Sequence, residues 1–338
     1  MSDKILICAP AWLGDMIMLH SLIQILYTAG HELHVLAPKW NVAVLERMPE
    51  ISKRVVLPIT HGELKLGQRY QIAKQLRREN YSRAIIAQNS FKSALIPFFA
   101  RIPQRTGWLR ECRGMLLTDG RKLDSQKLPL MVQRYAALAY TKNTSWDPND
   151  YPLPKLQTDD AMVKDTLARH KLSCCNKILA LSPGAAYGKT KQWPSRYYAD
   201  IANRKLVEGW QVWLFGSAND RVITDEVMKY TQHRCHNLAG RLQLFETVDL
   251  ISKVTALVSN DSGLLHVSAA LEVPVIGIYG STSPAFTPPL GETALTITAT
   301  ELECQPCFQR TCRYGHLNCL TTITPDRVLG RLDDMLNV

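Results

Sequence analysis

The stretch LVSNDSGLLHVSAALEVPVIGIYGSTSP, residues 257–284, contains a strand, a polar turn, a helix, a second strand and a second polar turn. Apolar strands that alternate with helices predict an open α/β sheet with parallel strands. In such sheets ligands bind at the carboxyl ends of the strands, where the chain turns into the next helix. The small, hydroxyl-bearing residues in both turns therefore predict a binding site along this edge.

The same alternation occupies both halves of the chain. Pro152 and Pro154 interrupt it, and the strand-like segments on either side are KILICA (4–9), ELHVLA (32–37), RVVLP (54–58), RAIIAQ (83–88), KILALS (177–182), WQVWLFG (210–216), TALVSN (255–260) and PVIGIYG (274–280). We predict two doubly wound Rossmann-like domains, residues 1–155 and 156–338. The last helix opens with Thr324 as N-cap and Pro325 in its first turn, and is a candidate to pack back on the first domain.

Composition limits the class of protein. The chain has 338 residues, of which 46% are hydrophobic, so two cores can be buried. No segment approaches the roughly 18 apolar residues that a membrane-spanning helix needs, and the N-terminus lacks the features of a signal peptide. Nine scattered cysteines do not suggest a secreted disulfide framework. We therefore expect a cytoplasmic protein with reduced thiols.

Positive charge is concentrated in the first half of the chain. The formal net charge is +10, and residues 61–142 contain 16 basic against 5 acidic residues. This excess indicates an anionic partner, although a solvated basic face would give the same count. Zinc-finger, RRM and helix-turn-helix patterns are all lacking, so we do not expect a nucleic acid as that partner.

Four strands of the second half end in small polar turns: SPG (182–184), FGS (215–217), SNDSG (259–263) and YGS (279–281). In the third, a helix is expected to start near Ser262, and Gly263 would let a ligand approach the exposed N–H groups of its first turn. One such turn is more often a simple helix cap, but four at one edge favour a nucleotide phosphate.

Three charged residues are candidates for chemistry around these turns. Lys191 of GKTKQWP is the candidate cation for a departing diphosphate, and Asp220, beyond the FGS turn, suits ribose hydroxyls. In the first domain, Gly14 and Asp15 fall at a strand-to-helix turn, which makes Asp15 the candidate general base. An ordinary loop lysine and two helix-capping carboxylates are the alternatives. The dinucleotide motif GxGxxG is lacking, which argues against a nicotinamide enzyme.

The motifs APAWLGDMIM, NSFKSALIPFFARIPQRTGW, KQWP, QVWLFGSAND, NDSGLLHVSAAL and YGSTSPAFTPPL occur in this order along nearly the whole chain. In this combination the sequence resembles the ADP-heptose:lipopolysaccharide heptosyltransferases of glycosyltransferase family 9. The resemblance implies the GT-B fold, with two Rossmann-like domains facing across a cleft. It also implies an ADP-heptose donor, a heptosyl-Kdo2-lipid A acceptor at the inner face of the bacterial inner membrane, and inversion by single displacement without a cofactor.

The resemblance also implies roles for single residues. Asp15 matches the family's proposed base and Lys191 its phosphate-binding lysine, whereas Ala186 stands where close relatives often carry an acid. The donor-binding set is Gly14, Lys191, Asp220, Asp261, Ser262, Gly263, Leu264 and His266. Asp261 is expected to face sugar hydroxyls, since a diphosphate would repel it. His266 is about equally well explained as a buried core histidine.

Arginines suit the carboxylates and phosphates of such an acceptor, because the guanidinium fork binds these groups in bidentate fashion. We expect Arg69, Arg105, Arg110 and Arg113 to bind the acceptor. Anionic lipid headgroups would attract the same face.

The cysteines of CQPCFQRTCRYGHLNC, Cys304, Cys307, Cys312 and Cys319, raise the question of a metal site. Only one CxxC pair occurs, so we expect packed thiols and no metal. A nucleotide-sugar epimerase of similar architecture and a two-lobed binding protein for small solutes remain alternative functions.

Overall fold

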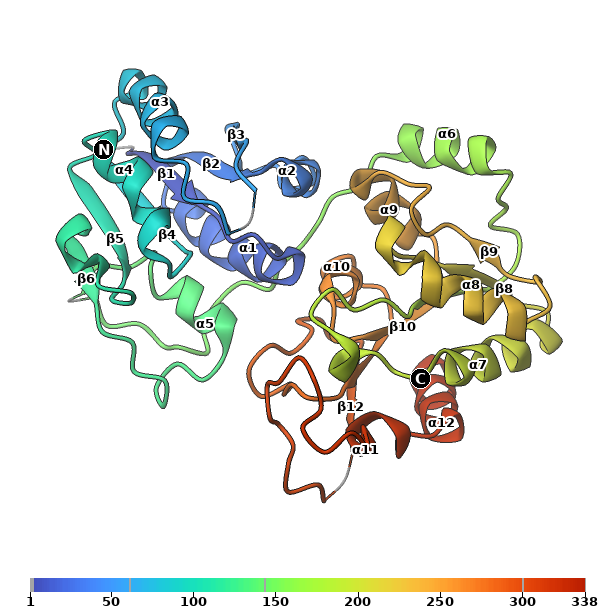
Figure 1. Ribbon diagram of the computed structural model, residues 1–338. Coiled ribbons are helices and arrows are strands. Elements are labelled where there is room, and N and C mark those ends of the chain that lie inside the picture. The colour runs from blue at the N-terminus through green and yellow to red at the C-terminus, as the bar shows by residue number, and fades with distance from the viewer. Residues whose placement is uncertain (1–2, 61, 143, 300, 338) are drawn as a thin grey trace. The chain divides into compact units, whose positions relative to one another are not determined.

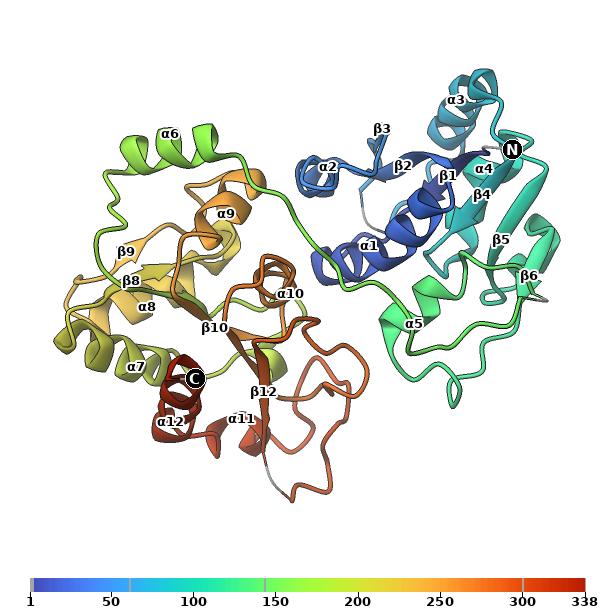
Figure 2. The same cartoon turned by 180° about the vertical axis from the view of Figure 1, so that it is seen from behind.

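The computed structural model describes residues 3–60, 62–142, 144–299 and 301–337 (Figure 1). The chain divides into two compact units, Met1–Pro154 and Lys155–Val338. Within the described residues each unit has one parallel sheet with six strands. Helices surround the sheet of each unit in the two opposite views (Figures 1 and 2). The prediction of an α/β fold with two doubly wound domains is confirmed.

The sheet of the first unit has the strand order β3-β2-β1-β4-β5-β6. The strands are β1 (Lys4–Cys8), β2 (Glu32–Pro38), β3 (Lys53–Leu57), β4 (Arg83–Ile86), β5 (Gln104–Trp108) and β6 (Asp119–Arg121). The order reverses between β1 and β4, so their carboxyl ends flank the point at which ligands bind in open α/β sheets.

Helices follow most of these strands. They are α1 (Leu13–Thr28), α2 (Lys39–Leu45), α3 (Leu66–Leu76), α4 (Leu95–Phe99) and α5 (Met131–Ala136), with short 3₁₀ turns η1 (Arg77–Glu79), η2 (Phe91–Ala94) and η3 (Arg113–Leu116). Helix α1 packs on α5, and α3 packs on α4.

The second unit repeats this topology with the order β12-β11-β10-β7-β8-β9. Its strands are β7 (Ile178–Ser182), β8 (Gln211–Leu214), β9 (His236–Asn237), β10 (Ala256–Asn260), β11 (Val275–Tyr279) and β12 (Ala294–Thr298). Here the order reverses between β7 and β10.

The helices of the second unit are α6 (Asp160–His170), α7 (Ser195–Val207), α8 (Arg221–Tyr230), α9 (Leu244–Ile251), α10 (Gly263–Ala270), α11 (Asn318–Thr321) and α12 (Pro325–Leu336), with 3₁₀ turns η4 (Lys189–Lys191) and η5 (Ala218–Asp220). Helix α12 is capped by Thr324 as predicted, since its side chain accepts a hydrogen bond from the Arg327 N–H. The buried face of α12 joins the core of the second unit and packs on α7, and its packing on the first domain stays a prediction.

All eight strand-like segments of the sequence are strands. The pattern missed β5, β6, β9 and β12, because these strands are short or carry polar residues. Strand β5 has the sequence QRTGW, in which Trp108 is the one large apolar residue. Strand β9 has only two residues.

Two of the four predicted acceptor arginines, Arg69 and Arg113, are buried inside the first unit. Arg113 is 0% exposed and donates hydrogen bonds to the Trp108 carbonyl oxygen, the Gln88 carbonyl oxygen and the Ser93 hydroxyl. Burial lowers its pKa to about 10, so it remains charged at neutral pH. Arg69 is 4% exposed and donates to the carbonyl oxygens of Leu64 and Lys92. Both side chains therefore fasten the chain that follows β4.

This burial leads to a stability prediction. We expect Arg113→Ala to lower the free energy of unfolding of the first unit by about 3 kcal/mol, because it leaves several buried carbonyl groups unpaired. This corresponds to roughly 6 to 12 °C in melting temperature. Arg110→Ala, at an exposed position in the same region, should change that temperature by about 1–2 °C or less. Equal melting curves for both variants in a thermal scan would contradict the clamping role of Arg113.

Candidate active site

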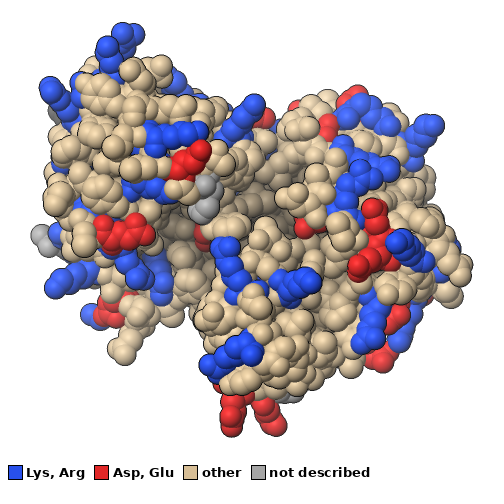
Figure 3. Space-filling model, in the orientation of Figure 1, with Lys and Arg blue, Asp and Glu red and all other residues tan. Residues whose placement is uncertain are grey.

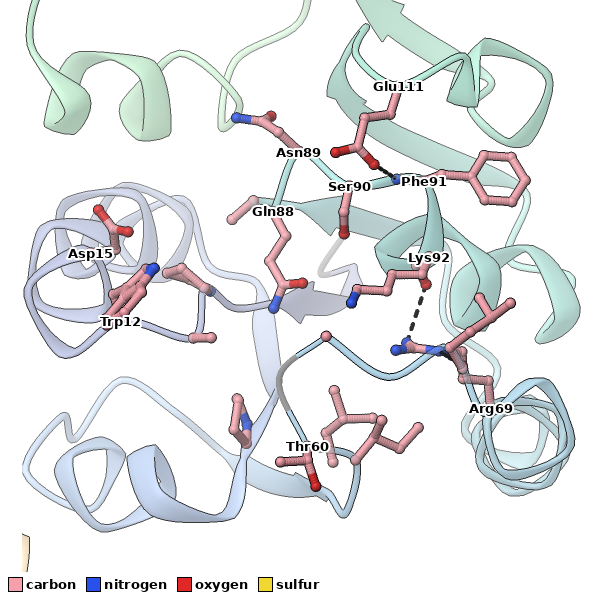
Figure 4. Close-up of a pocket in the computed structure, with 18 of the residues that line it drawn as sticks. Trp12, Asp15, Thr60, Arg69, Gln88, Asn89, Ser90, Phe91, Lys92 and Glu111 are labelled. Carbon is pink, nitrogen blue, oxygen red and sulfur yellow. Dashed lines mark hydrogen bonds between the residues drawn. The ribbon is translucent and has the colours of Figure 1, made fainter. Parts of the chain in front are cut away.

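A pocket of about 630 Å³ opens at the carboxyl ends of β1 and β4 in the first unit (Figure 4). The turn after β1 contributes Pro10, Ala11 and Trp12, and α1 contributes Asp15. The turn after β4 contributes residues 87–92. The pocket thus occupies the point where the strand order reverses, which is the expected ligand position in this fold.

Asp15 lies in the first turn of α1, directly after Gly14, and its side chain is partly buried. The N-cap residue Trp12 makes no side-chain hydrogen bond to this turn. The helix dipole favours a carboxylate at this position. Tyr135 of α5 lines the same pocket, and burial followed by the charge of Asp15 raises its pKa well above the usual value. The two side chains are thus close enough to interact electrostatically.

The pocket wall contains polar groups that the sequence analysis did not select. Figure 4 shows Gln88, Asn89, Ser90 and Lys92 around the opening. Gln88 donates to the Ala9 carbonyl oxygen (2.6 Å), which joins the β4 turn to the β1 turn. Lys92 could have been selected from the sequence, because its motif NSFKSA begins soon after β4 and residues that follow a central strand line this edge of the sheet.

The four predicted acceptor arginines occupy different environments. Arg69 lines the pocket, but its guanidinium binds backbone carbonyls, and Arg113 is fully buried. Arg105 is half-buried and donates to the Leu116 carbonyl oxygen (2.7 Å). Arg110 alone of the four is exposed. Of the four arginines, Arg110 is therefore best placed for direct contact with an acceptor, and this contact stays a prediction. Arg69 and Arg113 instead stabilise the pocket wall.

In the second unit, Asn260 joins the two strands at the reversal point. This side chain is 0% exposed, and its Nδ2 donates to the carbonyl oxygens of Pro183 (2.7 Å) and Gly184 (3.2 Å) in the turn after β7. Its Oδ1 accepts from the Trp193 N–H (3.0 Å) and the Tyr198 hydroxyl (2.9 Å). Every hydrogen-bonding group of this amide is used, so the turns after β7 and β10 are fixed relative to each other.

The next residue, Asp261, pairs with Lys191. The Lys191 Nζ lies 2.6 Å from the Asp261 Oδ2, and the same oxygen accepts a hydrogen bond from the Thr282 hydroxyl (2.6 Å). Asp261 is 5% exposed, while the Lys191 side chain retains 15% exposure. The predicted phosphate lysine and the predicted sugar-binding carboxylate are thus in direct contact at this edge of the sheet.

His266 of α10 lies close to this pair. It is 4% exposed, its Nε2 lies 4.0 Å from the Asp261 Oδ1, and burial lowers its pKa to about 4. Among the described residues its Nδ1 has no hydrogen-bond partner. At neutral pH the imidazole is therefore uncharged and offers a ring nitrogen for hydrogen bonding.

The helix α10 begins at Gly263, with Ser262 as N-cap, close to the predicted start. The Ser262 side chain does not cap the helix; its Oγ lies 3.1 Å from the Ser259 Oγ. Ser262, Gly263 and Leu264 are all partly exposed. The first-turn N–H groups thus lack side-chain capping, as expected at a phosphate-binding helix terminus.

Asp220 acts first as a local cap. Its Oδ2 accepts hydrogen bonds from the Ser217 N–H (2.8 Å) and the Ser217 hydroxyl (2.7 Å). A Cβ atom at Gly184 would lie 2.2 Å from the Asp220 Oδ1. The carboxylate therefore sits against the turn after β7, and both glycines, Gly184 and Gly216, are needed for this approach. Ribose contact stays a prediction.

Cys304, Cys307 and Cys312 of the loop before α11, and Cys319 within α11, are free thiols. Burial raises the pKa of Cys319 to about 11, with further contributions from Cys307, Cys304 and Cys312. Backbone N–H groups, first that of Leu317, lower the pKa of Cys312. No cluster of three His, Cys, Asp or Glu side chains suited to a metal occurs in the described ranges. The same ranges contain no helix long and apolar enough to cross a bilayer.

Comparisons with known proteins agree with this geometry. Residues 69–318 match the family model of glycosyltransferase family 9 (heptosyltransferase). The chain is 42% identical to lipopolysaccharide heptosyltransferase 2 of Salmonella typhimurium, over 99% of each chain. It is also 42% identical to lipooligosaccharide heptosyltransferase 2 of Haemophilus ducreyi, over 98% of this chain and 99% of that protein.

Among solved structures, the Escherichia coli ADP-heptose lipopolysaccharide heptosyltransferase II superimposes with a TM-score of 0.87. It is 40% identical, and the match covers 98% of each chain. The fold and the family expected from the sequence are both confirmed: this chain belongs to glycosyltransferase family 9, the heptosyltransferases.

Proposed function

We propose that this enzyme transfers L-glycero-D-manno-heptose from ADP-heptose to the first heptose of heptosyl-Kdo2-lipid A. The observation that carries the proposal is the end-to-end match, at 42% identity, to heptosyltransferases 2. The uncapped α10 terminus beside Lys191 supports it, because a nucleotide diphosphate needs N–H donors and a cation. These relatives favour heptosyl transfer over the epimerase and binding-protein alternatives.

The reaction is a single displacement with inversion. The acceptor hydroxyl oxygen forms a bond to the anomeric carbon, while the bond from that carbon to the β-phosphate oxygen breaks and ADP leaves with the electron pair. Asp15 accepts the hydroxyl proton. Lys191 and the N–H groups of Gly263 and Leu264 stabilise the charge that develops on the diphosphate.

The remaining donor residues orient the sugar and the nucleotide. Asp261 and neutral His266 bind heptose hydroxyls, since a carboxylate accepts hydrogen bonds from hydroxyls but repels phosphate. Asp220 binds the ribose through the oxygen that lies against Gly184. Gly14 lies beside the base in the first turn of α1 and completes the proposed donor-binding set.

The acceptor carries several negative charges, which the exposed Arg110 and the partly exposed Lys92 of the first unit can pair with. We assign acceptor contacts to Arg110 and Lys92. The buried Arg69 and Arg113 stabilise the segment after β4 that forms the pocket wall. Arg105 supports this surface from β5.

We further propose that the enzyme works at the cytoplasmic face of the inner membrane as a peripheral protein. Helices α3 and α4 pack together and expose Leu66, Tyr70 and Phe98. The half-buried Arg77 of η1 and Arg105 of β5 add positive charge beside the two aromatic rings, so that the five residues form an aromatic and basic patch. Tyr70 is 44% and Phe98 41% exposed. The Arg77 guanidinium lies 5.8 Å from the Tyr70 ring, and that of Arg105 5.7 Å from the Phe98 ring. Figure 3 shows further Lys and Arg side chains over the α3 region. Such a surface suits anionic headgroups.

The proposed reaction is tested with ADP-heptose and heptosyl-Kdo2-lipid A, by measuring the mass of the lipid. The parent enzyme should add one heptose. Asp15→Asn should reduce kcat by roughly 10² to 10⁴, because an amide cannot accept the proton. Asparagine is tolerated at helix N-termini, so its melting temperature and ADP affinity should match those of the parent.

The matched control is Asp326→Asn, which removes a carboxylate from the first turn of α12. It should react at the parent rate. If Asp15→Asn also keeps the parent rate, Asp15 is not the base.

The membrane proposal is tested by flotation with phosphatidylglycerol-rich and phosphatidylcholine vesicles. Tyr70→Ser/Phe98→Ser should lower binding to the anionic vesicles about tenfold, since two partly exposed aromatic side chains no longer enter the interface. The control Tyr27→Ser/Tyr230→Ser removes two aromatic side chains of equal or greater exposure elsewhere. If both double variants lose vesicle binding equally, or if neither loses it, the patch is not the membrane-binding surface.

A further inference from the structure

The cysteine-containing loop is fastened to the turns at the end of β11. The Gln305 Nε2 donates to the carbonyl oxygens of Tyr279 (3.0 Å) and Gly280 (2.7 Å). The Phe308 N–H donates to the Ser281 carbonyl oxygen (2.8 Å). Residues 305–308 therefore run along the same edge of the sheet as the Lys191–Asp261 pair.

The loop is also fastened to the segment that carries Lys191. The Thr190 hydroxyl donates to the Gln309 carbonyl oxygen (2.5 Å), and the Tyr187 hydroxyl donates to the Phe308 carbonyl oxygen. Gly188 has a φ of 150°, and a Cβ atom there would lie 2.7 Å from the Arg310 carbonyl oxygen. Glycine is required at this contact, so the close approach of the two segments is part of the fold.

These contacts bring Arg310 and Lys191 to the same aromatic ring, that of Tyr187. The Lys191 Nζ lies 4.9 Å and the Arg310 guanidinium carbon 5.1 Å from the centre of the same Tyr187 ring. The Arg310 side chain is exposed, and within the described ranges no carboxylate forms a salt bridge with it. Two cations thus share one aromatic ring at the mouth of the proposed donor site.

The charge of this site requires a second cation. Lys191 is already paired with Asp261 at 2.6 Å, so the two charges cancel before a ligand binds. The diphosphate of a nucleotide sugar brings two negative charges. An arginine that is not held in an ion pair is suited to this group, because its planar fork binds phosphate oxygens in bidentate fashion.

We propose that Arg310 binds the diphosphate of the donor and that the loop of residues 304–312 serves to position the Arg310 side chain for this contact. This inference deepens the proposed function and rests on it, since it names a further residue of the same donor site. Tyr187 positions both cations through cation–π contacts.

The experiment measures ADP and adenosine affinity by calorimetry in the parent, Arg310→Ala and Arg313→Ala. Arg313 is the matched control, because it is exposed, lies in the same loop and stacks on an aromatic ring, that of Tyr314 (4.6 Å). We expect Arg310→Ala to weaken ADP binding about tenfold or more, which is the usual effect of losing a charge-assisted hydrogen bond. Adenosine affinity should not change, Arg313→Ala should bind ADP like the parent, and Arg310→Lys should recover part of the loss.

Lys191→Ala separates this inference from the proposed function. If Lys191→Ala weakens ADP binding and Arg310→Ala does not, the role of Arg310 is refuted while the donor site stands. If neither variant weakens ADP binding, the donor site itself is refuted. A loss that is equal in Arg310→Ala and Arg313→Ala would show a general charge effect and overturn the assignment. Unchanged melting temperatures establish that the variants are folded.

Discussion

The strand-end turns of the second unit depend on one buried amide, that of Asn260. A buried amide without partners is costly, and here both polar atoms are satisfied by two groups each. The Nδ2 contacts fix the turn after β7, and the Oδ1 contacts fix the segment at Trp193 and helix α7. Because Asp261 follows directly and Lys191 is two residues before Trp193, this network also determines where the ion pair lies.

In the first unit, buried arginines fix the strand-end turns in the way that Asn260 does in the second unit. Arg113 and Arg69 bind carbonyl groups after β4 and so hold the pocket wall near Asp15. In both units the polar groups at the strand ends are tied together by side chains that are hardly exposed. A rigid support leaves Asp15, Lys92, Lys191 and Arg310 at the surface of the two sites, where a substrate can reach them.

Strand alternation was enough to predict the fold, and the polar turns indicated the sheet edge along which each candidate site lies. The roles of the arginines were not predictable, because an arginine that binds carbonyls and one that binds a ligand have the same local sequence signal. Arg113, Arg69 and Arg110 show this, since burial alone distinguishes them. Arg310 was missed for another reason: its neighbour Tyr187 is 123 positions away, and only tertiary contacts bring them together.

We propose that Asp261 neutralises Lys191 until the donor binds. Calorimetric ADP affinity of Asp261→Asn tests it most directly. Without the carboxylate, the diphosphate meets a lysine that is not engaged in an ion pair and no like charge, so ADP should bind about tenfold more tightly. Adding Lys191→Ala should abolish this gain. Weaker ADP binding by Asp261→Asn, in a variant that melts like the parent, would contradict the account.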